Sequence, residues 1–383
     1  MKKSFVSLLL VTILILGSIL TGCGSNPNTD EPDNDTQTTP TAAPTAEPTA
    51  APETTPTEAP APTQEVPAEV TVTDSDGNEV TVKTNPAKVA IFDYSILDIL
   101  YNIGFEKTGI TQVIVPAKDN LPDALSFYSG AGDDTVISGG SLFYVDWDVM
   151  DLVQPDLVIV GGRAFNMNAS GERLSREDAA KYRSDTVERY PGTGFIKLTT
   201  NSTDSQLLID IEHNIQVLAQ IFPVLKPELE AKLAELKAGI AEIHDKAANS
   251  GKKALFCMMV DQTTLSIFNP TSRFDMLYEE FGFAPADDSS AVEWTDQHGF
   301  DVRAEYVLEK NPDVIFLLDR SATVGTGAGA ENFLNDPIIK QTQAAVNGDI
   351  YILSGDAWYT MTGGISATEV MISDIKQYID KLQ

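Results

Sequence analysis

Two arginines occupy matching positions in this 383-residue sequence, and their spacing suggests a site for an anion. Arg163 lies eight residues after Pro155, Arg320 lies eight residues after Pro312, and Arg273 is a third arginine in a turn-like segment. A guanidinium group keeps its charge and presents a planar fork of donors. A lone arginine usually forms a surface salt bridge. A matched pair with a third arginine nearby instead favours a cationic pocket for a compact, multiply anionic ligand.

His298 and Tyr359 add a second chemistry, because imidazole and phenolate oxygen are both donors for Fe(III). If both reach the same crevice, they complete the coordination of an iron that its chelator leaves partly open. A hydrogen-bonding loop histidine and a packing tyrosine explain the same residues, and spacing alone does not decide between the two interpretations. Trp358 and Tyr94 are predicted to be aromatic walls of the pocket.

The elements that position Arg163 and Arg320 are two copies of one pattern, offset by 157 residues. Residues 148–160 and 305–317 each predict an amphipathic helix, a Pro-Asp turn and an unbroken apolar strand. Such strands beside helices are typical of parallel sheets that are covered on both faces. Each arginine would follow the carboxyl end of its strand, so the two would stand on opposite lips of a crevice.

A second pair of segments supports the duplication. Residues 88–92 and 253–256 are predicted strands. Residues 97–104 and 274–282 are predicted helices, and each ends at a glycine, which is a common helix stop. The sequence therefore predicts two related α/β lobes.

One long helix is predicted to connect the lobes. Residues 207–222 have helical periodicity, and residues 228–248 form a second helix rich in Leu, Ala and charged residues. We therefore predict an α/β fold of two Rossmann-like lobes joined by one long helix. The predicted segments are a signal peptide at 1–22, a lipidated cysteine and spacer at 23–68, an N-terminal lobe at 69–225, a connecting helix at 226–249 and a C-terminal lobe at 250–383.

The first residues are typical of an export signal. Lys2 and Lys3 precede an apolar stretch, and Leu-Thr-Gly stands directly before Cys23. This order matches a secretory signal peptide that ends in a lipoprotein box, so Cys23 is predicted to carry the lipid, such as palmitate, after cleavage. A short transmembrane anchor followed by a chance cysteine is the alternative. The expected location is the extracytoplasmic face of the cell membrane, with the lipid as anchor.

Composition separates a spacer from the globular part. Residues 24–68 hold ten of the 21 prolines, eight Asp or Glu and no Lys or Arg, which is typical of an extended spacer or a disordered, glycosylated tail. The formal charge of the chain is −30, and −24 remains without Lys2, Lys3 and these eight acids. Such a surface argues against nucleic acid as a partner. Cys257 lies in an apolar run and is predicted to be a buried core thiol.

Several of these segments resemble one family. They are Lys88-Val89-Ala90-Ile91-Phe92-Asp93, Gly161-Gly162-Arg163, His298-Gly299, Lys310-Asn311-Pro312-Asp313, Leu318-Asp319-Arg320-Ser321 and Trp358-Tyr359. Across residues 69–383 the chain resembles the ferric-siderophore-binding lipoproteins of ABC importers, and among them the catecholate and petrobactin binders. The resemblance implies a class III periplasmic-binding-protein fold in which one helix links the lobes. A monomer is expected.

The resemblance also implies roles for individual residues. Arg163, Arg273 and Arg320 would surround the anionic chelate, and His298 and Tyr359 would ligate its iron, as in some members of the family. The Fe(III) would arrive with the siderophore, and no intrinsic cofactor is implied. The implied partners are the ferric siderophore, an ABC permease with its ATPase and the membrane to which the lipid is anchored.

Asp148 and Glu305 are matched candidates for docking to that permease, because the family docks through one acidic residue per lobe. Both lie seven residues before their proline and open equivalent predicted helices. The helix dipole alone also favours acids at these positions. Both explanations stay open at this point.

Other interpretations are compatible with the sequence. A binding protein for haem, a corrinoid or a free metal ion would share the fold, although a bare metal site needs several converging ligands. An enzyme is not expected, because no Gly-x-Ser-x-Gly, His-Glu-x-x-His or phosphate loop is present. An extracellular sensor module is a further alternative. The charged segment 166–194 departs from the family pattern and predicts either a rim that changes the ligand or a solvated insertion.

Overall fold

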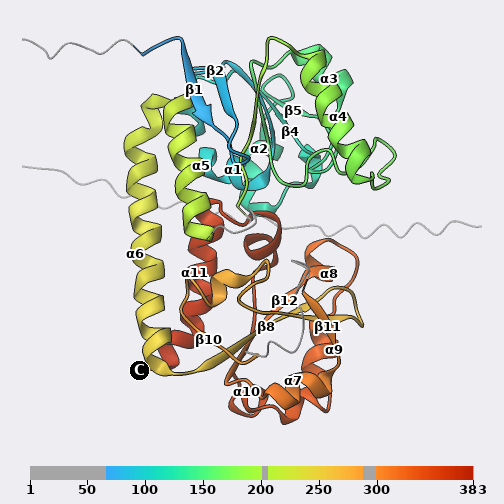
Figure 1. Cartoon of the computed structure of the whole chain (residues 1–383), viewed down its shortest axis with the longest axis vertical. Helices are drawn as coiled ribbons and strands as arrows, with labels where there is room; N and C mark the ends of the chain where they lie inside the picture. Colours follow the sequence, from blue (N-terminus) through green and yellow to red (C-terminus); the bar gives the residue numbers. More distant parts are fainter. Residues whose placement is uncertain (1–65, 201–205, 288–298, 383) are drawn as a thin grey trace, which may run out of the picture. The chain divides into compact units, whose positions relative to one another are not determined.

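The computed structural model describes residues 66–200, 206–287 and 299–382, which contain two larger β-sheets and several long helices (Figure 1). No helix in these ranges has both the length and the apolar character needed to cross a membrane. The predicted signal peptide, Cys23, most of the spacer and His298 lie outside the described residues. A hairpin of β1 (Glu69–Thr73) and β2 (Glu79–Lys83) begins the described chain.

The first larger sheet carries the N-terminal copy of the duplicated pattern. Its elements are β3 (Lys88–Phe92), α1 (Tyr94–Asn102), β4 (Gln112–Val115), α2 (Ser126–Gly130), β5 (Val136–Ser138), α3 (Trp147–Val153), β6 (Leu157–Val160), α4 (Arg176–Arg189) and β7 (Gly194–Lys197). The strands follow the order β5-β4-β3-β6-β7, and all pairs are parallel, as predicted. Val89 and Ile91 pack in one hydrophobic cluster, whereas Ala90 and Phe92 pack in another, so both faces are covered.

The second larger sheet carries the C-terminal copy. Its elements are β8 (Lys253–Met259), β9 (Leu265–Phe268), β10 (Ala284–Pro285), β11 (Phe300–Val302), α7 (Ala304–Lys310), β12 (Val314–Asp319), α8 (Arg320–Thr323), α9 (Ala330–Asn335), α10 (Gln343–Asn347) and β13 (Ile350–Ile352). The predicted parallel pairing holds for β12 with its neighbours β8 and β13. The strand β9 was not predicted and runs antiparallel to β8, because a tight turn at Asp261 is too short for a parallel crossover.

Asp156 and Asp313 extend the duplication to side-chain contacts. Each directly follows a proline that comes shortly after the end of α3 or α7, as the sequence predicts. Asp156 accepts a hydrogen bond from the amide of Lys88 at 3.1 Å, and Asp313 accepts one from the amide of Lys253 at 3.0 Å. Each aspartate therefore ties its turn to the start of the neighbouring central strand, β3 or β8.

The predicted helix at 274–282 is wrong. Only a short 3-10 helix, η5 (Asp275–Leu277), forms there, followed by irregular turns. The buried hydroxyl of Tyr278 donates to the carbonyl of Phe268 at 2.7 Å and accepts from the amide of Phe256 at 3.2 Å. Packing of these aromatic residues into the core therefore overrides the local helical pattern.

Three long helices connect and support the two sheets (Figure 1). They are α5 (Leu207–Ile221), α6 (Lys226–Ser250) and α11 (Ile365–Ile379). The connector α6 ends at Gly251, whose φ of 64° provides a left-handed cap. The helix α11 packs against both α6 and α1, and α5 packs against α6. The lobe boundaries at 69–225 and 250–383 stay a prediction.

Short helices complete the described chain. One is a π-helical turn, η7 (Asp356–Thr360), which precedes α11. Besides η5, the 3-10 helices are η1 (Phe105–Lys107), η2 (Lys118–Asn120), η3 (Asp123–Leu125), η4 (Pro223–Leu225), η6 (Ile339–Gln341) and η8 (Asp380–Leu382).

Asp98 in α1 joins the N-terminal half to α11. Its side chain is 0 % exposed and accepts hydrogen bonds from the side chain of Asn102 at 2.8 Å, the hydroxyl of Ser366 and the amide of Ala367 at 3.3 Å. A Cβ at Gly364 would stand only 2.2 Å from Asp98 Oδ2, so this approach requires glycine. Burial raises the pKa of Asp98, although these hydrogen bonds oppose the rise.

Candidate ligand-binding site

The three predicted arginines converge on one residue, Tyr359. The guanidinium groups of Arg163 and Arg273 both donate to the backbone carbonyl of Tyr359, at 2.5 and 2.9 Å. The Nε of Arg320 donates to the hydroxyl of the same tyrosine at 2.8 Å. The three guanidinium carbons lie 5.4, 4.5 and 5.5 Å from the centre of the Tyr359 ring, respectively. The structure therefore brings together four residues that the sequence analysis selected.

These four residues come from different parts of the fold. Arg163 follows the carboxyl end of β6 in the first sheet, and Arg320 follows the carboxyl end of β12 in the second. Arg273 lies between β9 and η5, and Tyr359 lies in the π-helical turn η7. Ligand sites of α/β sheets form at the carboxyl ends of strands, and π-helical turns often occur at functional sites. The contact between Arg163 and Tyr359 joins the two halves of the chain.

The three arginines have no salt-bridge partner among the described residues. Within the described residues, none of the three forms a salt bridge with an Asp or Glu; their hydrogen bonds go to Tyr359 and the carbonyl of Val260. Burial and the neighbouring charges of Arg163 and Arg320 lower the pKa of Arg273 to about 10, so it remains a cation at neutral pH. A surface salt-bridge role is therefore a poor description of this cluster.

Tyr359 responds to the same charges. Burial alone would raise the pKa of its phenol, but the hydrogen bond from Arg320 and the three positive charges outweigh burial and lower it. A phenol whose pKa is lowered gives up its proton more readily. This property suits an oxygen donor for a metal, and also a hydrogen-bond acceptor for the arginines.

Tyr94 and Asp93 lie beside this cluster at the start of α1. Burial and the charge of Asp356 raise the pKa of Tyr94 to about 12, and Arg163 opposes that rise. Burial also raises the pKa of Asp93, again against the charge of Arg163. A Cβ at Gly161 would approach Asp93 Oδ2 to 1.9 Å, so only glycine fits there. The sequence analysis missed Asp93 as a site residue, although its position at the carboxyl end of a predicted strand was a usable signal.

Trp358 is fully buried. Its side chain is 0 % exposed, its Nε1 donates to Asp374 at 3.0 Å, and its ring packs against Phe256 and Phe281. The predicted aromatic wall at this position is therefore part of the core beneath Tyr359. Cys257 is also buried, as predicted, and burial raises the pKa of its thiol.

Only one of the two predicted iron ligands is among the described residues. Tyr359 lies in the arginine cluster, whereas His298 lies outside the described residues. Within the described ranges, no group of three or more His, Cys, Asp or Glu side chains is arranged to hold a metal ion. His213 lies in α5, and its Nε2 is buried and has no hydrogen-bond partner among the described residues.

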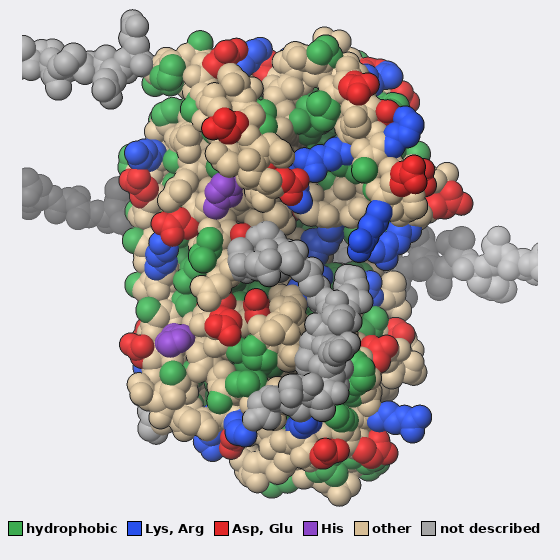
Figure 2. Space-filling model, in the orientation of Figure 1, with side chains coloured by type: hydrophobic (Ala, Val, Ile, Leu, Met, Phe, Trp, Pro, Cys, Tyr) green, Lys and Arg blue, Asp and Glu red, His purple; other side chains and the backbone are tan. Residues whose placement is uncertain are grey.

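Asp148 and Glu305 lie in elements that carry none of the four residues of the arginine cluster. Both are exposed residues in the first turns of α3 and α7, so the duplication places them at equivalent points. Each also lines a surface cavity, Asp148 beside Trp147 and Glu305 beside Arg303. On the face shown in Figure 2, Lys and Arg side chains are interspersed with Asp and Glu side chains rather than gathered into one broad basic surface.

Comparisons with known proteins give one family match and several similar proteins. The family model described as "Periplasmic binding protein" matches residues 89–357. The chain is 26% identical over 307 residues to the petrobactin-binding protein YclQ of Bacillus subtilis, covering 80% of this chain and 86% of the relative. It is 25% identical over 306 residues to the ferric-anguibactin-binding protein FatB of Vibrio anguillarum, covering 79% and 86%.

Solved structures give the same result. The crystal structure of YclQ has a TM-score of 0.68 at 25% identity and covers 82% of this chain and 99% of that chain. The periplasmic catecholate-siderophore binding protein VctP of Vibrio cholerae has a TM-score of 0.67 at 25% identity, covering 81% and 99%. The predicted two-lobed fold is confirmed by these neighbours.

Proposed function

Because the chain belongs to the periplasmic binding protein family, we propose that it is the extracytoplasmic solute-binding component of an ABC importer. Its ligand is an anionic ferric siderophore, of the catecholate type, which it captures between the two lobes and delivers to the permease and its ATPase. The named relatives that bind petrobactin, ferric anguibactin and catecholate siderophores support this assignment. The iron travels as part of the cargo, and the protein acts by binding rather than by catalysis.

The observation that carries the proposal is the convergence of Arg163, Arg273 and Arg320 on Tyr359 without a salt-bridged carboxylate. Three guanidinium groups share one tyrosine, and no described carboxylate forms a salt bridge with them. Like charges at short range repel, and this repulsion is relieved when a multiply negative ligand enters. A ferric tris-catecholate carries several negative charges on oxygen atoms, which match the planar donor forks of arginine. A neutral ligand would leave the repulsion in place.

A titration with three candidate ligands tests the proposal. Purified protein is titrated with a ferric tris-catecholate, with haem and with cobalamin, and binding is followed by fluorescence quenching and by absorbance. We expect the ferric catecholate to bind most tightly. Arg273→Gln should weaken that binding by about 10- to 100-fold, because each lost bond joins charged groups. Arg176→Gln, at an exposed position in α4, is the matched control and should bind like the wild type.

Two outcomes would overturn the proposal. The first is preferential binding of haem or cobalamin over the ferric catecholate, which would assign a different ligand to the cluster. Alternatively, Arg273→Gln and Arg176→Gln would bind the ferric catecholate equally well, which would remove the arginine cluster from recognition.

Direct ligation of the iron by Tyr359 and His298 is the finer part of the proposal. The lowered pKa of the Tyr359 phenol supports an oxygen donor at this point. Protein ligands matter only when the chelator leaves coordination positions open. We therefore expect Tyr359→Phe and His298→Ala to weaken a tetradentate ferric catecholate much more than a hexadentate one. Equal effects on both chelates would contradict direct ligation.

Anchoring through Cys23 is the other finer part. The Leu-Thr-Gly-Cys sequence after an apolar stretch supports cleavage and lipid attachment at this cysteine. Cys23→Ser should therefore move the protein from the membrane fraction to the soluble fraction and abolish labelling with palmitate. The ligand affinity of the purified protein should not change, because the arginine cluster lies far along the chain.

A further inference from the structure

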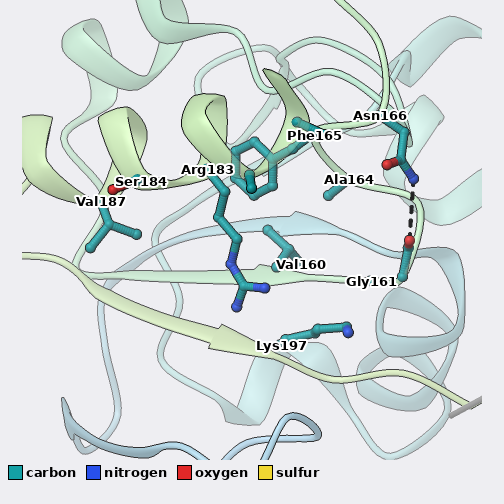
Figure 3. Close-up of a pocket in the computed structure, with 12 residues that line it drawn as sticks. Val160, Gly161, Ala164, Phe165, Asn166, Arg183, Ser184, Val187 and Lys197 are labelled. Carbon is teal, nitrogen blue, oxygen red and sulfur yellow. Dashed lines mark hydrogen bonds between the residues drawn. The ribbon is translucent and has the colours of Figure 1, made fainter. Parts of the chain in front are cut away.

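A cavity of 510 Å³ lies between α4 and the carboxyl ends of β6 and β7 (Figure 3). We refer to it as the α4 pocket. Its lining residues are Val160, Gly161, Gly162, Ala164, Phe165, Asn166, Ala179, Ala180, Arg183, Ser184, Val187 and Lys197. It therefore opens at the same sheet edge from which Arg163 reaches Tyr359, and Gly162 of its lining directly precedes Arg163.

The helix that forms one wall of the α4 pocket is firmly attached to the fold. The ring of Tyr182 packs against Phe165 and Trp147, with ring centres 5.2 and 5.5 Å apart, and its hydroxyl donates to the carbonyl of Val145. Trp147 Nε1 also donates to the hydroxyl of Thr186 at 2.9 Å. These contacts place one face of α4 in the core. The segment 166–194 thus contains a helix that is anchored to the fold, and whether it is a rim that changes the ligand or a solvated insertion stays open at this point.

Two cations of the α4 pocket share a single carboxylate. Arg183 donates to Asp76 at 3.0 Å, and Lys197 donates to the other oxygen of Asp76 at 2.6 Å. Among the described residues, Asp76 is their only ion-pair partner. The guanidinium group has five N–H donors and the ammonium group has three, so both keep donors beyond these bonds. Both cations therefore keep donors that an incoming anion can use.

The rest of the lining is mostly apolar and suits an organic group. Val160, Ala164, Phe165 and Val187 surround the cavity, and Figure 3 shows the side chains of Arg183 and Lys197 pointing into it. Fixed hydrophobic walls with a few placed polar groups are typical of small-molecule sites. The combination fits a group that has both carbon surface and a negative charge, such as a carboxylate on an alkyl or aryl arm.

We propose that the α4 pocket is an accessory subsite for a carboxylate-bearing arm of the ligand. The chelate core binds to Arg163, Arg273 and Arg320, and the arm extends past Gly162 to Arg183 and Lys197. This inference rests on the proposed function, because it assumes that the arginine cluster holds the core. In this proposal, residues 166–194 select among siderophores. These siderophores bind iron through the same groups but differ in their peripheral substituents.

A pair of matched chelates tests this subsite. One is a ferric tris-catecholate with a free carboxylate on one arm, and the other is its methyl ester. We expect the wild-type protein to bind the acid about tenfold more tightly than the ester, as for one charge-assisted hydrogen bond. Arg183→Gln should abolish this preference without weakening the ester. Arg176→Gln removes the same charge from the same helix and should keep the preference.

A second variant covers the case in which Arg183→Gln perturbs the helix. Ala180 is exposed on α4 and lines the α4 pocket, so Ala180→Trp fills the cavity without changing charge. This variant should weaken binding of the acid chelate more than binding of a ferric tris-catecholate that lacks the arm. Free benzoate, added in excess, should compete for the arm site and reduce the preference for the acid in the wild type only.

The failures of the two proposals are distinguishable. If both chelates bind tightly and equally to the wild type, the subsite is wrong and the proposed function stands. The subsite is also wrong if Arg183→Gln weakens acid and ester alike. If neither chelate binds, or if Arg163→Gln leaves both affinities unchanged, the proposed function itself is wrong. If benzoate binds to the α4 pocket but the acid chelate shows no preference, the pocket takes free carboxylates and not an arm of the ligand.

Discussion

Arg320 Nε donates a hydrogen bond to the hydroxyl of Tyr359 at 2.8 Å, so a strand-end arginine acts directly on the acidity of a phenol in another element. Because this donor and its charge help to lower the pKa of Tyr359, Arg320→Gln should raise that pKa. Alkaline titration followed by ultraviolet difference spectroscopy measures the phenolate. Subtracting the Tyr359→Phe titration isolates the signal of this one tyrosine. An unchanged titration in Arg320→Gln would contradict the coupling.

Asp98 provides a prediction on stability. Asp98→Ala removes the acceptor for Asn102, Ser366 and Ala367 in a fully buried position. We expect a loss of about 2–4 kcal/mol in the free energy of unfolding, because buried donors are left without partners. Urea denaturation measures this loss. Asp185→Ala, which removes an exposed carboxylate paired with Lys181, is the control and should cost less than about 1 kcal/mol.

Glu280 makes stability depend on pH. Its side chain is 5 % exposed; Oε1 accepts from the amide of Leu208 at 3.4 Å, and Oε2 has no partner among the described residues. Burial and the charge of Asp275 raise its pKa to about 7, and burial raises the pKa of Asp275 to about 6, with Asp210 adding to that rise. The folded protein therefore holds protons that the unfolded chain releases at lower pH.

The sign of this effect follows from linkage. The contribution of Glu280 to stability is fully present below its unfolded pKa of about 4.3 and is lost as pH rises through about 7. Glu280→Gln stays neutral, so it should be more stable than the wild type by about 1–3 kcal/mol near pH 8 and similar to it near pH 5. Chemical denaturation at both pH values measures the difference. A constant difference at the two pH values would exclude titration of Glu280 as the cause.

Asp148 and Glu305 give a prediction that separates binding from transport. Both acids are exposed and lie in elements that carry no residue of the arginine cluster, so Asp148→Ala and Glu305→Ala should leave siderophore affinity unchanged. Uptake of radioactive iron by cells should fall at least about tenfold in the double variant, as expected when charge pairs at an interface are lost. Asp178→Ala, an exposed acid in the first turn of α4, should transport normally. Normal uptake by the double variant would contradict docking through these acids.

The convergence of the arginines was predictable because it follows from a duplicated local pattern. The proline and aspartate of each copy fix where the strand starts. The length of the apolar run then predicts where the strand ends and that the arginine follows it. Arg273 was harder to predict, because the segment after it packs as irregular turns around Tyr278 rather than as the expected helix. Long-range aromatic packing of this kind leaves no periodic signal in the sequence.

The direction of side chains and the structure of the charged segment 166–194 could not be predicted from the sequence either. Trp358 and Tyr359 are neighbours in a π-helical turn, yet one ring enters the core and the other meets three arginines. Strand or helix spacing does not reveal which of two adjacent aromatics turns inward. The high charge of 166–194 left open whether the segment is a rim or a solvated insertion, because a sequence does not show that Tyr182 anchors the helix while its neighbour Arg183 faces a cavity.

The contact between Asp98 and Ser366 also bears on the order of folding. The two residues are 268 positions apart, so bringing them together closes a very long stretch of chain. Contacts between residues so far apart in the sequence form more slowly than the nearer contacts within each sheet. We therefore expect the docking of α11 on α1 to form late, so mutations that weaken α11 should mainly speed unfolding.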